Sequence, residues 1–431
     1  MRNKILNFYA VAALLGFITG TVGSLFLLTI NKVTDWLTRF NDYGRAHEWP
    51  LGLVSAIVSM LMIYSAWLMV KWFATEASGS GVQEIEGTLL RKRPIFWRRL
   101  LPVKFFGGVL AISSKLVVGR EGPTIQIGGN LGEMLGEWLG LSRNRRDSLI
   151  AAGAAAGLAT AFNAPLAGIL FVLEEMRSQF RFSFSNFTAV TIACAMAVIM
   201  LHMIVGTDPA IPMHVFNLPR LSSQWFFLLF GIVVGFVGLF FNIALMKSLS
   251  WIGRLSPLMR DVYVVFVGLL VGYFVYLQPQ MVGAGYDIIE QSLTMSPSLS
   301  VLLLLVGARF IMTILSYNVG APGGFFAPML ALGTLLGLSA SYFFQWAVHD
   351  LTAGPGVFAV AGMGALFAAV VRAPVTGIVL VVEMTQNYSL ILPLMVTCLA
   401  ATTVVQLAGN RPIYTQLLKL TLEKQANAAK N

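Results

Sequence analysis

The strongest chemical signal in the sequence is the pentapeptide Gly-Arg-Glu-Gly-Pro at residues 119–123, between apolar runs at residues 101–118 and 124–141. An arginine or a glutamate at membrane depth costs roughly 3 kcal/mol or more, so such groups persist mainly where they line an aqueous or ionic path. The glycines permit irregular backbone, and Pro123 suits the first turn of a helix, where its missing N–H is not needed. The pentapeptide therefore predicts a broken helix whose second segment starts beside a cavity.

Glu121 is the residue of this pentapeptide that could act as a switch. A helix N-terminus attracts anions through its unpaired N–H groups and its partial positive charge. An ionised carboxylate at that place competes with a dissolved anion for the same donors, whereas a protonated carboxyl does not. The alternative is an ion pair with Arg120, but adjacent residues of a helix point in different directions. The hypothesis is an anion site with a titrating competitor tethered beside it.

The composition places this pentapeptide in a membrane protein. Of the 431 residues, 57% are hydrophobic and only 11% are charged, against about 25% charged residues in soluble proteins. Apolar runs long enough to cross a bilayer recur along the chain, so we predict an all-α polytopic membrane protein whose first span is at the N-terminus.

The net charge of +10 comes largely from loops. Basic residues cluster at residues 91–99 and 143–147, and such clusters are typical of cytoplasmic loops, which is a better explanation than binding to nucleic acid. If both clusters lie on the cytoplasmic face, residues 100–141 enter and leave by the same face as a re-entrant pair.

Enzyme and metal chemistry find no support in the sequence. Cys194 and Cys398 lie in apolar runs, and the four histidines lack the spacing of metal ligands. No nucleotide-binding motif, zinc-protease motif or nucleophile–base pair is found. We therefore predict a protein that is not an enzyme and that holds no metal and no cofactor.

The second half of the sequence repeats the first. Three glycine- or proline-interrupted blocks recur in the same order at nearly constant spacing: residues 79–89 match 283–293, residues 119–123 match 320–324, and residues 163–174 match 372–383. Interrupted segments at corresponding positions of two halves are the sequence sign of a transporter whose site lies at the repeat interface.

This repeat predicts the domain organisation. We expect a first membrane repeat at residues 1–206, an inter-repeat loop at 207–222 and a second membrane repeat at 223–408. Residues 409–431 should form a cytoplasmic C-terminal helix and tail.

The motifs resemble the signature segments of the CLC family of chloride channels and chloride/proton exchangers. Gly-Ser-Gly at residues 79–81 followed by Glu-Ile-Glu-Gly at 84–87, the pentapeptide at 119–123, and Gly-Gly-Phe-Phe-Ala-Pro at 323–328 follow the family's order. Tyr388 looks like the fourth site element of the family. The resemblance covers nearly the whole chain and is closest to the bacterial exchangers.

The resemblance implies a fold and an activity. The fold would be a CLC-like inverted repeat of tilted, broken and re-entrant helices, multi-pass in the bacterial inner membrane and surrounded by lipid. The protein would exchange chloride for protons as its substrates, as a homodimer with one pathway per subunit. Residues 183–206 and 389–406 are apolar candidates for the dimer face. The alternatives are a passive voltage- or pH-gated chloride channel of the same fold and a fluoride exporter.

The resemblance also implies roles for individual residues. The Ser80 and Tyr388 hydroxyls and backbone N–H groups around Phe325 and Phe326 would hold the central anion. Hydroxyl donors carry no permanent charge, so binding stays weak enough for release. Glu121 would be the external gating glutamate. A helix N-cap remains an alternative role for Ser80, and an interfacial anchor an alternative for Tyr388.

Glu175 would be the internal proton-transfer glutamate, although its position also suits a solvated helix end. We expect the other charged residues near membrane depth to serve structural pairing or capping; they are Glu84, Glu86, Lys104, Arg309 and Glu383. Two positions depart from the family pattern. Gln83 stands where the family usually has proline, and Phe325 replaces a commoner aliphatic residue without changing the kind of its backbone N–H.

Overall fold

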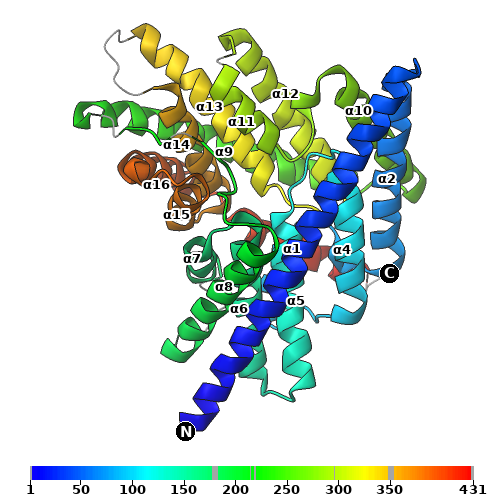
Figure 1. Ribbon diagram of the computed structural model, residues 1–431, viewed down its shortest axis with the longest axis vertical. Coiled ribbons are helices and arrows are strands. Elements are labelled where there is room, and N and C mark those ends of the chain that lie inside the picture. The colour runs from blue at the N-terminus through cyan, green and yellow to red at the C-terminus, as the bar shows by residue number, and fades with distance from the viewer. Residues whose placement is uncertain are drawn as a thin grey trace. The chain divides into compact units, whose positions relative to one another are not determined.

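A computed structural model describes residues 2–176, 183–213, 215–217, 220–295, 297–347 and 354–428. These residues are mostly helical (Figure 1). They form two compact units. The first contains Met1–Asp208, Ser256–Ala284 and Leu315–Ala327, and the second contains Pro209–Leu255, Gly285–Ile314 and Pro328–Asn431. Each unit is thus assembled from segments that are far apart in the sequence.

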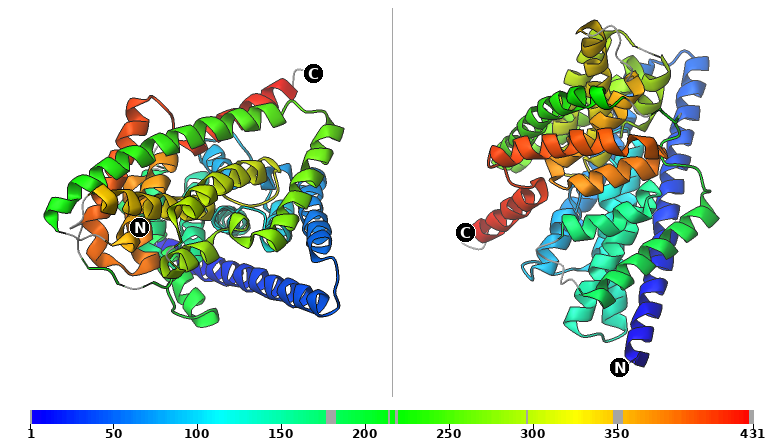
Figure 2. Two further views of the ribbon diagram at one scale, coloured as in Figure 1. Left: turned by 90° about the horizontal axis from the view of Figure 1, so that it is seen from above. Right: turned by 90° about the vertical axis from the view of Figure 1, so that its left-hand side faces the viewer.

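The first unit is built from nine α-helices and two 3-10 turns of the described chain. They are α1 (Arg2–Ala46), α2 (Leu51–Phe73), η1 (Thr75–Ala77), α3 (Val82–Leu89), α4 (Trp97–Ser113), α5 (Glu121–Trp138), α6 (Arg143–Phe162), α7 (Pro165–Glu174), α8 (Phe184–Ile204), α10 (Pro257–Leu277) and η3 (Pro279–Met281). The long helix α1 packs along α4, α5, α6 and α8, as Figure 2 also shows.

The second unit is also helical in its described residues. Its elements are η2 (Leu221–Ser223), α9 (Gln224–Ile252), α11 (Tyr286–Met295), α14 (Pro355–Val371), α15 (Pro374–Thr385), η4 (Tyr388–Leu390), α16 (Ile391–Leu407) and α17 (Ile413–Ala428). Two further helices, α12 (Leu299–Asn318) and α13 (Phe326–Ala347), contain residues of both units.

Eight of the described helices are long and apolar enough to cross a membrane. They include α1, where the sequence predicted the first membrane span, and also α2 and α8. Other apolar helices are shorter, such as α7 and α15. The prediction of an all-α polytopic membrane protein with interrupted helices is confirmed.

The two proline breaks have the same backbone. Asn163 follows α6 in the left-handed region with φ 53°, and Pro165 opens α7. Arg372 follows α14 with φ 70°, and Pro374 opens α15. The residue before proline avoids the helical region, which stops the first helix, while proline suits the start of the next. Matching sequences at the two positions thus give matching helix–break–helix units.

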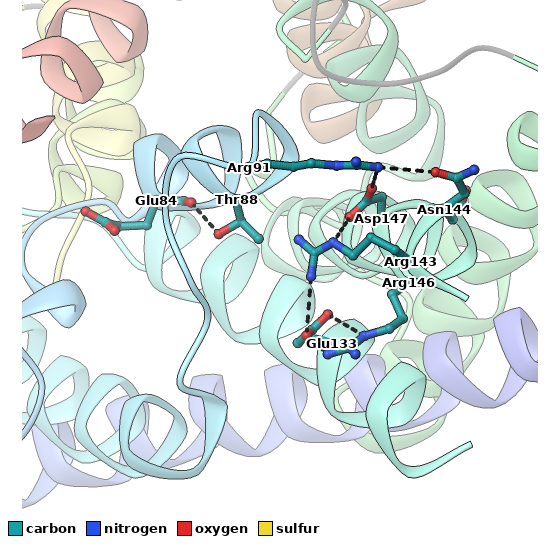
Figure 3. Close-up of polar contacts among 9 residues, drawn as sticks. Glu84, Thr88, Arg91, Glu133, Arg143, Asn144, Arg146 and Asp147 are labelled. Carbon is teal, nitrogen blue, oxygen red and sulfur yellow. Dashed lines mark hydrogen bonds and ion pairs between the residues drawn. The ribbon is translucent and has the colours of Figure 1, made fainter. Parts of the chain in front are cut away.

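The helices α4 and α5 form an antiparallel pair, with the start of α4 near the end of α5. At the start of α4, the indole N–H of Trp97 donates to Glu137 at 2.6 Å, near the end of α5. An ion pair holds the loop before α4 against the start of α6: Arg91 pairs with Asp147 at 3.6 Å (Figure 3). Arg146 and Glu133 also form an ion pair there. The two basic clusters therefore lie on the same side, which brings the turn between α4 and α5 into the interior.

Glycine lets α5 and α6 approach closely. A Cβ on Gly128 would lie 2.8 Å from the carbonyl carbon of Gly153, and a Cβ on Gly132 would lie 2.6 Å from that of Leu149. Such spacing leaves no room for a side chain, which explains why glycine recurs every four residues along α5, at Gly128, Gly132 and Gly136. A Cβ on Gly140 would have no atom within 4 Å, and this residue adopts φ +59°. Gly140, the next glycine at the same spacing, therefore serves the turn after α5 rather than helix packing.

Candidate functional site

The glycine-rich breaks meet through backbone hydrogen bonds in the first unit. The N–H of Gly119 donates to the Gly324 carbonyl at 2.6 Å, and the N–H of Gly324 donates to the Gly119 carbonyl at 2.9 Å. The N–H of Gly79 donates to Ala321 at 3.1 Å, and the N–H of Gly323 donates to Gly79 at 3.1 Å. Three motifs that are distant in sequence are therefore fastened together at one place.

Several helices begin at this meeting point. The helix α3 begins at Val82, α5 at Glu121 and α13 at Phe326. The first N–H groups of a helix have no acceptor within it, and neither α3 nor α5 has a side-chain cap. The positive φ of 84° at Gly81, a conformation that favours glycine, turns the chain into α3. The result is a cluster of backbone donors around one interior region.

Ser80 lies at the centre of this cluster. Its side chain is fully buried, and its hydroxyl oxygen has no hydrogen-bond partner among the residues that the structure describes. A Cβ on Gly122 would lie 2.5 Å from this oxygen, and one on Gly324 would lie 3.6 Å from it. A buried hydroxyl without a partner costs about 1–3 kcal/mol. A bound ligand would remove that cost.

Glu121 is the first residue of α5 and is also fully buried. Its carboxylate folds back against Gly119, where a Cβ would contact it and would also lie 3.0 Å from the Cβ of Ala327. The carboxylate is therefore close to the start of α13 as well as to the start of α5. The hydroxyl of Thr124 donates to the Glu121 carbonyl at 2.8 Å and steadies this turn of backbone.

Phe325 and Phe326 are fully buried, and aromatic neighbours hold their rings. The Phe325 ring meets the Tyr317 ring edge-on at 5.0 Å, and the Phe326 ring lies 6.2 Å from that of Phe171. Anchored rings fix the backbone at the start of α13, the helix that begins at Phe326.

The loop that carries Ser80 is held by two buried polar side chains. Lys104 donates to the carbonyls of Ala77 at 2.9 Å and Gly79 at 2.7 Å. Gln126 of α5 donates from Nε2 to the Glu76 carbonyl at 2.9 Å. These contacts agree with the structural role that we expected for Lys104. They make the loop a fixed part of the site.

Glu175 follows the last residue of α7 as its C-cap and is half-buried. Its carboxyl is close enough to interact electrostatically with the carboxyl of Glu86, which is 1% exposed on α3 and whose oxygens have no hydrogen-bond partner among the described residues. The structure thus brings together an acid that we expected to move protons and one that we expected to be structural. Glu84, which is also on α3, forms an ion pair with Arg93 at 2.7 Å.

Tyr388 belongs to the second unit, where it opens the 3-10 turn η4 and is 63% exposed. The flanking residues fix this turn. Asn387 accepts from the Phe216 N–H at 2.8 Å, and Ser389 donates to the Phe216 carbonyl at 2.6 Å. The structure brings Ser80, Glu121, Phe325 and Phe326 together in the first unit, whereas the role of Tyr388 remains a prediction from the sequence.

The structure also shows where Gln83 and Arg309, two residues singled out in the sequence, are located. Gln83, which stands where the family usually has proline, is 7% exposed in the first turn of α3, so that turn forms without the proline. Arg309 is fully buried, with its guanidinium beside Gly285 in the second unit. Within the described residues, no group of three or more His, Cys, Asp and Glu side chains could hold a metal ion.

Sequence reasoning missed Tyr317, a buried tyrosine that contacts Ser80 and Phe325. It lies before the signature segment at residues 323–328 and inside an apolar run, so no local pattern distinguished it from a core residue.

Broken apolar helices that begin around a buried hydroxyl and a buried carboxylate define an ion-conducting membrane protein. A family model described as "Voltage gated chloride channel" matches residues 61–406. The chain belongs to the CLC family, and it is a multi-pass membrane protein.

Curated relatives in this family match over almost the full chain. The chain is 46% identical over 417 residues to an H(+)/Cl(-) exchange transporter ClcA of Vibrio parahaemolyticus, which covers 96% of this chain and 89% of the relative. It is 43% identical over 435 residues to a protein of the same name from Yersinia pestis, with 97% and 88% covered.

Solved structures agree in fold. A slow cyanobacterial Cl-/H+ antiporter superposes with a TM-score of 0.93 at 40% identity, covering 97% of this chain and 99% of that one. A eukaryotic CLC transporter superposes with a TM-score of 0.81 at 21% identity, covering 98% and 75% of the two chains. The CLC fold that the sequence predicted is confirmed.

Proposed function

We propose that this protein is a secondary active transporter that exchanges chloride for protons. The observation that carries the proposal is the buried Ser80 hydroxyl without a protein partner, next to a buried glutamate at the start of α5. A donor without an acceptor suits an anion, and an acid beside it suits coupling to protons. The names of the relatives that match over nearly the whole chain support chloride as the anion.

Glu121 acts as the external gate in this proposal. When it is ionised, its carboxylate competes with chloride for the N–H groups at the starts of α5 and α13. When it is protonated, the competition ends and chloride reaches the donors. Proton binding and chloride binding therefore use overlapping space, which couples their movements. Ser80, the N–H groups of Phe325 and Phe326, and the Tyr388 hydroxyl hold the central anion.

Glu175 receives the proton on the internal side, and its electrostatic interaction with the Glu86 carboxyl supports this role. Two facing carboxyls resist being ionised together, so one proton is readily kept between them. A proton held at such a pair is available for exchange without a permanent charge in the membrane. Glu86 thereby assists proton transfer rather than serving only as a structural residue.

The proposal also includes the assembly of the protein. Residues 1–206 and 223–408 are two inverted repeats, joined by a loop at 207–222 and followed by a cytoplasmic helix and tail at 409–431. Each subunit of a homodimer carries its own pathway. Chloride and protons are the substrates, and transport needs no cofactor.

Reconstituted vesicles test the proposal. An outward chloride gradient should drive protons into the vesicle against their own gradient, measured together with chloride efflux by two electrodes. Glu121→Gln should abolish proton movement while chloride still passes, because glutamine keeps the shape but cannot ionise. Glu137→Gln is the control, since Glu137 lies at the exposed end of α5, paired with Trp97 and Arg98.

Chloride flux without proton movement in the wild-type protein would contradict exchange and identify a passive channel. Fluoride flux that far exceeds chloride flux would identify a fluoride exporter instead.

A further inference from the structure

Tyr317 is a buried tyrosine close to the candidate anion site. It lies one residue before the end of α12, in the part of that helix that belongs to the first unit, and is 5% exposed. Immediately after α12 the chain enters the break at residues 320–324, which is fastened to Gly119 and Gly79. The side chain is therefore held where two of the signature motifs meet.

The hydroxyl oxygen of Tyr317 is directed at the loop that carries Ser80. It accepts a long hydrogen bond of 3.4 Å from the backbone N–H of Ser80. A Cβ on Gly79 would lie only 2.9 Å from the same oxygen, so glycine at that position makes room for it. The Tyr317 hydroxyl therefore lies against the backbone of residues 79 and 80, the loop that carries the Ser80 hydroxyl.

The hydrogen of the Tyr317 hydroxyl is unused within the described protein. Its oxygen accepts from Ser80, but no hydrogen bond of the described residues takes its hydrogen. Ser80 presents the same situation, with a buried hydroxyl that has no partner in that part of the chain. One of these buried hydroxyls is carried by the loop at residues 79–81 and the other is bonded to the backbone of that loop, and both lack an acceptor, which points to an acceptor supplied by a ligand.

The ring of Tyr317 contacts a second candidate ligand. It meets the Phe325 ring edge-on, with centroids 5.0 Å apart and an interplanar angle of 70°. One side chain thus touches Ser80 through its hydroxyl and Phe325 through its ring. This arrangement fixes the direction of the hydroxyl, because the ring cannot swing without losing its contact with Phe325.

We propose that Tyr317 is a further anion ligand, whose hydroxyl donates to the anion that the Ser80 hydroxyl also binds. The inference rests on the proposed function and adds a residue to its anion site. Accepting from the Ser80 N–H polarises the hydroxyl and makes it a better donor. The hydroxyl adds affinity without a permanent positive charge, so the anion can still leave.

The alternative is that Tyr317 only anchors the Ser80 loop as an acceptor. The test compares Tyr317→Phe with Tyr263→Phe in the purified full-length protein, using chloride titration calorimetry. Tyr263 is the matched control, because its hydroxyl belongs to the same unit but already donates to the Leu315 carbonyl at 2.8 Å. Tyr317→Phe should raise the chloride Kd about tenfold or more, the effect of losing one hydrogen bond to a charged group. Tyr263→Phe should leave it unchanged.

A second variant separates a donor from an acceptor and keeps the protein's shape. Incorporation of 3-fluorotyrosine at position 317 makes the hydroxyl a stronger donor and a weaker acceptor. If Tyr317 donates to the anion, chloride should bind about two- to threefold more tightly than in the wild-type protein. If Tyr317 only accepts from Ser80, chloride binding should be unchanged or weaker, which would overturn the proposal.

The outcomes distinguish this inference from the proposed function. A chloride Kd of Tyr317→Phe within twofold of wild type overturns the role of Tyr317 alone. Wild-type protein that neither binds chloride nor couples it to protons overturns the proposed function and this inference together.

Discussion

Replacing Ser80 with alanine should weaken anion binding without weakening the fold. The mutation deletes one buried oxygen atom that has no hydrogen-bond partner in the described protein. Without chloride, no protein hydrogen bond is lost, and removal of an unsatisfied hydroxyl offsets the small cavity that remains. We therefore expect chloride-free stability within about 0.5 kcal/mol of wild type.

The loss of anion binding can be calculated from one hydrogen bond to a charged acceptor, which contributes about 1.5–3 kcal/mol. That range corresponds to a rise in chloride Kd of about 10- to 150-fold. At a chloride concentration of about 100 times the wild-type Kd, chloride should stabilise the wild-type protein by about 2.7 kcal/mol. A variant with a Kd about 100-fold higher should gain only about 0.4 kcal/mol under the same conditions.

Two measurements on detergent-purified protein test this expectation. Titration calorimetry gives the chloride Kd, and the thermal unfolding midpoint is compared in chloride and in a chloride-free gluconate buffer. Ser113→Ala is the matched control, because Ser113 is a buried serine of the same unit whose hydroxyl donates to the Ile30 carbonyl at 3.3 Å. The control should lose chloride-free stability by about 1 kcal/mol and keep the full response to chloride.

The reasoning is refuted if Ser80→Ala keeps the wild-type response to chloride. It is also refuted if Ser80→Ala loses as much chloride-free stability as Ser113→Ala, since Ser80 would then hold a protein contact rather than an anion.

Two further changes test the proton path and the helix packing. Glu175→Gln should reduce chloride-driven proton movement in vesicles at least tenfold while calorimetry still detects chloride binding, because glutamine cannot carry a proton; unchanged proton movement would remove Glu175 from the mechanism. Gly153→Ala should lower stability by about 1–3 kcal/mol, since its Cβ would collide with the Gly128 backbone. Gly307→Ala on α12, with no atom within 4 Å of the added carbon, should be neutral or stabilising in the same thermal unfolding measurement. An equal loss in both glycine variants would contradict the packing argument.

The helix starts and breaks could be predicted from local sequence because their causes are local. Pro123 permits only the first turn of a helix or a break, and α5 begins at Glu121 as expected. The Ala-Pro breaks at Pro165 and Pro374 gave matching helix ends for the same reason. The apolar runs predicted the membrane-spanning helices, because a helix needs about 20 apolar residues to cross the hydrocarbon core of a bilayer.

The side-chain contacts of the site could not be predicted in the same way. The bond between Ser80 and Tyr317 joins residues 237 positions apart, and no periodicity encodes such a contact. The contact between Glu86 and Glu175 likewise depends on how α3 packs against the region around α7. Spacing along one helix shows which face a residue occupies but not which partner that face meets, so the structural role expected for Glu86 did not include a neighbouring acid.

The pairing of Gly119 with Gly324 explains how a repeated backbone gives an asymmetric site. Each break alone ends one helix and starts another, whose first N–H groups have no acceptor within that helix. The two bonds between Gly119 and Gly324 bring the break at residues 119–123 against its counterpart at 320–324. The first break contributes an acid, Glu121, and the second leads directly into the start of α13. The acid can compete for the donors of α13 only because the two breaks are joined. In our proposal, the coupling of chloride to protons therefore originates in the pairing of the breaks, and neither break could supply it alone.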